Sequence, residues 1–137
     1  MNFNTRLKYH IPFVIVCMAI FIESSFPSDS YPKTTFELSD KIIHFLIYFV
    51  LYLATHYSFS NQNKFKLLSK YSLMTSFIFI LLYGASDEFH QYFVPGRSCD
   101  FFDWLADVLG ALFAISILLF FEKLANNKKN KSVNTVL

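Results

Sequence analysis

Apolar residues dominate four stretches of the chain, which polar and charged segments separate. The stretches cover residues 11–26, 41–59, 71–89 and 104–124. Each approaches the ~20 residues that a helix needs to cross ~30 Å of hydrocarbon. In lipid, backbone polar groups must be hydrogen-bonded within the protein, so such stretches form helices. The pattern therefore predicts an all-α protein, a bundle of four antiparallel transmembrane helices joined by short loops.

The composition favours an exterior that faces lipid. Of the 137 residues, 54% are hydrophobic and 20% are aromatic, and Phe alone occurs 18 times. A soluble domain of this size would struggle to bury so much apolar surface, whereas a bilayer solvates it. The net charge of +2 implies no nucleic-acid partner. The expected partner is the lipid bilayer.

The first stretch is short and follows the basic residues Arg6 and Lys8, which is also the pattern of a signal peptide. It ends in Ser24, Ser25 and Pro27, without the small-residue motif of a cleavage site. An uncleaved first helix is therefore favoured over a removed leader.

Basic residues predict the orientation of the four helices, because cytoplasmic loops carry an excess of Lys and Arg. With the N-terminus inside, the cytoplasmic segments are 1–10, the loop at 60–70 and a polar, disordered tail at 125–137. These segments and their borders carry nine basic residues, and the outer ones carry three: Lys33, Lys41 and Arg97. We therefore expect both termini in the cytoplasm.

Acidic residues show the opposite distribution. In this topology nine of the ten lie towards the outer side, and only Glu122 lies inside. Acidic residues contribute little to orientation, so insertion alone does not explain the asymmetry. Helical spacing also places them on shared faces: Asp40 with His44, Asp87 with Gln91, and Asp100, Asp103 and Asp107 together. The sequence predicts a polar site near the outer ends of the helices.

Simpler roles exist for some of these residues. Asp40 is a possible cap of the second helix, with Ser39 as its rival, and Asp103 a possible cap of the last helix. Lys41 is able to extend to the interface without any further role. Asp87 and Asp107 lie away from the predicted helix starts, so an interior polar role is favoured for both.

The spacing demands no metal. His44, Asp87, Glu88 and Asp107 would suit Mg²⁺ or Mn²⁺ better than zinc if they met. Cys17 and Cys99 lie at different expected depths and form neither a disulfide nor a zinc motif. We therefore predict neither a metal nor another cofactor.

Residues 87–110 read DEFHQYFVPGRSCDFFDWLADVLG, and residues 40–48 read DKIIHFLIY. Both segments closely resemble the VanZ-like family, whose pattern is D-K-x-x-H-F-x-x-Y, then D-E-x-x-Q-x-F-x-P-x-R and an Asp that starts the last helix. The resemblance covers roughly residues 11–121. Two departures are Asp107, where many relatives carry Asn, and Ala114, where some carry Gly.

The resemblance implies a multi-pass protein of the bacterial cytoplasmic membrane. The family's named member accompanies glycopeptide-resistance genes and is linked to low-level teicoplanin resistance, but the family's reaction is not established. Two functions stay open. One is a membrane enzyme acting on an envelope molecule, in which Asp87, Glu88 and His44 are the candidate catalytic residues. The candidate binding residues are Asp40, Lys41, Gln91, Arg97, Asp103 and Asp107, with Arg97 suited to an anionic group.

The second function is a non-catalytic module, in which the same residues form a satisfied polar network. Such a module would bind an envelope lipid, a lipoglycopeptide or a protein partner. A transporter is less expected, since four short helices without broken segments leave little room for a pathway.

Overall fold

The computed structural model describes residues 3–28 and 37–136. Within these ranges all regular structure is helical, which confirms the all-α class. The five helices are α1 (Phe3–Ser24), α2 (Glu37–Asn61), α3 (Lys66–Lys70), α4 (Ser72–Gln91) and α5 (Phe101–Val136).

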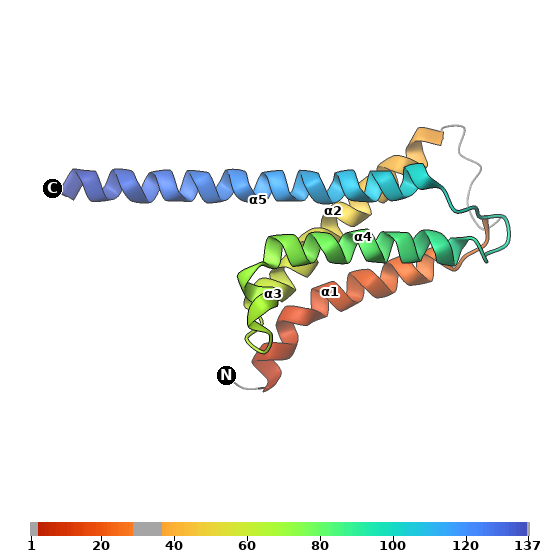
Figure 1. Ribbon diagram of the computed structural model, residues 1–137, viewed down its shortest axis with the longest axis horizontal. Coiled ribbons are helices and arrows are strands. Elements are labelled where there is room, and N and C mark those ends of the chain that lie inside the picture. The colour runs from red at the N-terminus through yellow and green to blue at the C-terminus, as the bar shows by residue number, and fades with distance from the viewer. Residues whose placement is uncertain (1–2, 29–36, 137) are drawn as a thin grey trace.

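The four long helices run alternately in opposite directions, as Figure 1 shows. Helices α2 and α4 pack against each other, and both also contact α1 and α5. In the described part of the chain, α1 and α5 have no contact with one another. The last turns of α1 and α4 and the first turns of α2 and α5 thus lie at the same end of the fold (Figure 1).

Two helix boundaries differ from the expected ones by more than two turns. Helix α1 begins at Phe3 rather than near residue 11. Helix α5 continues to Val136, where a disordered tail was expected from residue 125. No Gly or Pro interrupts residues 111–136, and adding residues to an existing helix avoids the cost of nucleating a new one. Polar composition alone therefore did not mark the end of this helix.

Small residues bring α2 and α5 close together. Ala111 and Ala114 of α5 are fully buried, and a Cβ atom at Gly110 would collide with the backbone oxygen of Phe45 in α2. Around this contact the core contains Ile20, Tyr48, Leu51, Tyr52 and Ile80. Close backbone approach at Gly and Ala is typical of packed membrane helices.

The exterior of the helices is strongly apolar. Ile15 on α1, Met74 and Leu82 on α4 and Phe120 on α5 all expose more than half of their surface. Two segments, Asp40–Asn61 and Phe101–Asn130, are each long and apolar enough to cross a membrane. A soluble protein would bury such side chains, so these features are those of a membrane protein.

Candidate functional site

Polar side chains from three helices meet inside the end of the fold where α4 finishes and α2 and α5 begin. We call this group the polar cluster. Its members are Lys41 and His44 of α2, Asp87, Glu88 and Gln91 of α4, and Asp103 and Asp107 of α5. Apart from Lys41, which is half-buried, all of these residues are buried.

His44 and Asp107 form a direct contact between α2 and α5. Nδ1 of His44 lies 3.0 Å from Oδ1 of Asp107, and the Asp107 side chain is completely buried. Helix α4 leaves room for this carboxylate, because a Cβ atom at Gly84 would lie only 2.9 Å from its Oδ2 atom. The missing side chain at Gly84 thus lets Asp107 approach α4 closely.

Asp87 is held by hydrogen bonds from two helices. The hydroxyl of Tyr48 on α2 donates to Oδ2 of Asp87 over 3.3 Å. The side-chain amide of Gln91, one turn further along α4, donates to the same oxygen over 3.4 Å. Both donors are uncharged, and Asp87 forms no ion pair among the described residues.

Lys41 bridges two carboxylates at the start of α5. Its Nζ atom lies 3.0 Å from Oδ2 of Asp100 and 2.9 Å from Oδ1 of Asp103. Asp100 also caps α5, since its Oδ1 accepts the backbone N–H of Phe102 over 2.8 Å. This backbone hydrogen bond, together with Lys41, lowers the pKa of Asp100 below its ordinary value. The cap of α5 is therefore Asp100, and Asp103 lies within the first turn.

Glu88 connects the cluster to the loop before α5. Its Oε2 atom accepts the backbone N–H of Asp100 over 2.8 Å. The other carboxylate oxygen, Oε1, is buried and has no hydrogen-bond partner among the described residues. The same holds for Oδ2 of Asp107. Two buried acceptors of the polar cluster are thus left unsatisfied.

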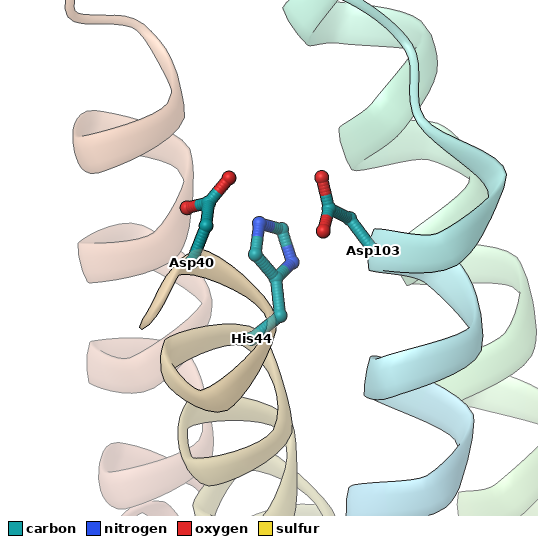
Figure 2. A group of neighbouring side chains, drawn as sticks. All are labelled: Asp40, His44 and Asp103. Atoms are coloured by element: carbon teal, nitrogen blue, oxygen red, sulfur yellow. The ribbon is translucent and has the colours of Figure 1, made fainter. Parts of the chain in front are cut away.

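Figure 2 shows the imidazole of His44 between the carboxylates of Asp40 and Asp103. Helix α2 begins at Glu37, so Asp40 lies inside its first turn, and neither Asp40 nor Ser39 is the cap. Asp40 is exposed, unlike the other two residues. His44 belongs to two groups whose ligand atoms lie within 4.8 Å of one another: Asp40, His44 and Asp103, and His44, Glu88 and Asp107.

The guanidinium of Arg97 lies at the end of α1. Its Nη2 atom is 2.9 Å from Oε1 of Glu23, and its Nε donates to the backbone oxygen of Phe26 over 3.4 Å. Arg97 therefore has a carboxylate of the chain itself as an ionic partner.

A shallow cavity of about 300 Å³ lies between α1 and α4 and reaches the polar cluster at Asp87. Its walls are mostly aromatic. The lining residues are Phe21 of α1, then Tyr83, Ser86, Asp87, Phe89 and His90 of α4, and Phe93 just beyond it. We call this cavity the α1–α4 groove.

Three residues of this region were not among the candidates from sequence. Tyr48 lies four positions after His44, and Asp100 lies three before Asp103, so both continue stripes that were already visible. Gly84 lies four positions before Glu88 on the same face of α4. The need for glycine at this position arises from its contact with Asp107, which joins two helices and is not visible in the sequence of either one.

Known proteins place the chain in a family. The sequence pattern of the VanZ/LLP1 family matches residues 9–122. An uncharacterised protein of Schizosaccharomyces pombe is 26% identical over 92 residues, which cover 67% of this chain and 54% of that protein. The chain thus spans about half the length of this relative. No solved structure matches this chain. With five-sixths of its length covered by the family pattern, the chain belongs to the VanZ/LLP1 family.

Proposed function

We propose that all four long helices span the membrane, with both termini in the cytoplasm and the polar cluster near the outer face. The support for α1 and α4 is the apolar surface that they share with α2 and α5, including Ile15, Met18, Met74 and Leu82. The charged end of α4 fits this arrangement because Asp87 and Glu88 point into the bundle. The distribution of Lys and Arg supports the orientation.

We further propose that the chain is a membrane enzyme that acts on a lipid-linked molecule of the cell envelope. The observation that carries this proposal is the pair of buried, unsatisfied oxygens on Glu88 and Asp107. A network that only stabilised helix packing would satisfy its polar atoms, since each buried orphan costs about 1–3 kcal/mol. Oxygens kept open beside a histidine are suited to take or give a proton.

The α1–α4 groove supports an amphiphilic substrate. Phe21, Phe89 and Phe93 line it and are largely exposed on the outer surface of the helices, while Asp87 is buried at its polar side. A lipid-linked molecule would lie with its chain against the aromatic rings and its polar group at Asp87. Asp87 is then the proposed proton donor or acceptor, with Glu88 and His44 behind it.

The similarity to the Schizosaccharomyces pombe protein does not decide the choice of substrate. That relative is uncharacterised, so the proposed substrate rests on the groove and on the polar cluster of this chain. Binding of a lipoglycopeptide would be a secondary consequence of a groove that accepts acyl chains.

One observation favours the non-catalytic alternative. Lys41 joins Asp100 and Asp103, and Arg97 joins Glu23, so three ion pairs connect the loops and helices at this end. If the remaining polar residues serve the same purpose, the cluster is a structural module for binding a lipid or a protein.

The two functions predict different behaviour of nearly isosteric variants. In a strain that lacks the chain, we expect mass spectrometry of lipid extracts to show an altered lipid-linked species. Wild type and the distant control Glu122→Gln should restore it, whereas Asp87→Asn and Glu88→Gln should not, at unchanged abundance in the membrane. Loss of abundance in both variants, or full restoration by Asp87→Asn, would overturn the enzyme proposal.

A further inference from the structure

Three carboxylates of the polar cluster, those of Asp87, Glu88 and Asp107, lack a lysine or arginine partner in the described part of the chain. The ammonium group of Lys41 is already shared by Asp100 and Asp103. Asp87 and Glu88 have no cationic partner in the described ranges, and Asp107 has only His44. Removing ionised carboxylates from water without compensation costs several kcal/mol each. Something must therefore neutralise this region.

Protonation alone does not solve the problem. A proton on Oε1 of Glu88 or on Oδ2 of Asp107 would turn an acceptor without a partner into a donor without a partner, since neither atom has a hydrogen-bonding neighbour among the described residues. Both side chains are at least nine-tenths buried, with 3% of Glu88 and none of Asp107 exposed. A bound cation would satisfy the charge and the open lone pairs together.

The geometry fits a small divalent ion. His44, Glu88 and Asp107 each offer one ligand atom, and these atoms lie within 4.8 Å of one another. Ligands about 2.1 Å from a common ion lie about 3.0 Å apart at a right angle and about 4.2 Å apart on opposite sides. Nδ1 of His44 and Oδ1 of Asp107 are 3.0 Å apart, which is the right-angle separation. The 4.8 Å limit exceeds the separation of opposite ligands by only about 0.6 Å, so small side-chain movements would bring the three ligand atoms around one ion.

We propose that His44, Glu88 and Asp107 bind a divalent cation, for which Mn²⁺ is the best match. Two carboxylates favour Mg²⁺ or Mn²⁺, and the imidazole favours the first-row ion of the two. Three helices supply the ligands, and the missing side chain at Gly84 leaves space beside Asp107. Other coordination positions remain for water or for an oxygen of the substrate.

The neighbouring group is a poorer site. Oδ1 of Asp103 already contacts the ammonium of Lys41 at 2.9 Å, and a second cation there would be repelled. Asp40 is exposed and therefore well solvated without a metal. Of the two groups that share His44, the one with Glu88 and Asp107 has all three residues buried and contains unsatisfied oxygens.

Metal binding is measurable on the purified full chain in detergent after treatment with a chelator. Titration with MnCl₂, followed by electron paramagnetic resonance, should show one bound ion per chain, and pulsed spectra should show coupling to an imidazole nitrogen. Glu88→Gln and Asp107→Asn should weaken binding by at least about tenfold, because loss of a group that merely orients a ligand already costs about 10–100-fold. Asp40→Asn and Glu122→Gln should change it by less than about threefold.

Three results would overturn the site. The first is no binding of Mn²⁺, Zn²⁺ or Mg²⁺ to wild type at about 1 mM, the weak end of protein affinities. The second is bound Mn²⁺ without nitrogen coupling, a result that needs no variant to fold. The third is loss of binding in Asp40→Asn but not in Glu88→Gln.

The inference rests on the proposed function only in using the same end of the bundle. The two fail separately, because Asp87→Asn removes no metal ligand. Mn²⁺ binding combined with full restoration of the lipid species by Asp87→Asn would refute the proposed function and support the metal site. Lack of Mn²⁺ binding combined with loss of function in Asp87→Asn would refute the metal site and support the proposed function.

Discussion

Gly110 allows a sharp test of the helix packing that builds the polar cluster. Replacing it with alanine should raise helix propensity by about 0.5–1 kcal/mol. The added Cβ atom would, however, collide with the backbone oxygen of Phe45 and lie 3.0 Å from the backbone nitrogen of Phe49. Backbone atoms do not move aside as the end of a flexible side chain does, so α2 and α5 must separate.

The expected sign follows from comparing the two effects. A separation on the order of 1 Å forfeits a quarter to a half of each dispersion contact at the interface, and overpacking of this kind costs about 1–3 kcal/mol. The clash therefore outweighs the gain in propensity. Gly110→Ala should be destabilised by up to about 2 kcal/mol, which is up to about 30-fold in the unfolding constant.

Trp104 makes the measurement direct, because it is the single tryptophan of the chain. Its indole N–H donates to the backbone oxygen of Leu81 on α4, so its emission reports separation of α4 and α5. Unfolding in mixed micelles with increasing dodecyl sulfate gives the free energy. Ser116→Ala, at an exposed position of α5, should change stability by less than about 0.5 kcal/mol. A more stable Gly110→Ala would show that propensity decides and that the helices do not meet at Gly110.

Two further predictions concern the loop before α5. Cys99 is exposed, so an impermeant maleimide should label it in intact cells of a Cys17→Ala background; labelling only after lysis would reverse the orientation. Because the pKa of Asp100 is lowered in the folded state, its contribution to stability is present above its ordinary pKa of about 4 and is lost as the pH falls further. The difference in unfolding free energy between wild type and Asp100→Asn should thus be constant above about pH 5 and should decrease as the pH falls below about 4. A difference that is unchanged at about pH 3 would refute this explanation.

Local patterns in the sequence were sufficient for the helices and their polar faces. Hydrophobic periodicity and length do not depend on neighbouring helices, so the all-α class followed from them. Spacings such as that of Asp87 and Gln91 also hold within one helix, and the structure keeps these two side chains in contact. Contacts of this kind are local in the chain.

Pairing between distant segments was not predictable in the same way. Arg97 was assigned to an anionic ligand, yet it contacts Glu23, 74 positions away in the chain. Nothing in either segment indicates that the end of α1 lies beside the loop after α4. The close approach of Gly84 to Asp107 likewise depends on how α4 and α5 pack. The length of α5 was missed because a polar composition does not end a helix that is already formed.

The charges of the polar cluster lie in two layers, and the difference between them favours a functional site over a structural network. In the first layer, Lys41 forms ion pairs with Asp100 and Asp103. One turn further into the bundle lie His44 on α2 and Asp107 on α5, and there no lysine or arginine compensates the carboxylates in the described part of the chain. A second lysine would complete a static network. A histidine beside open carboxylate oxygens instead can bind and release a proton or a metal ion, which is what an exchangeable site requires.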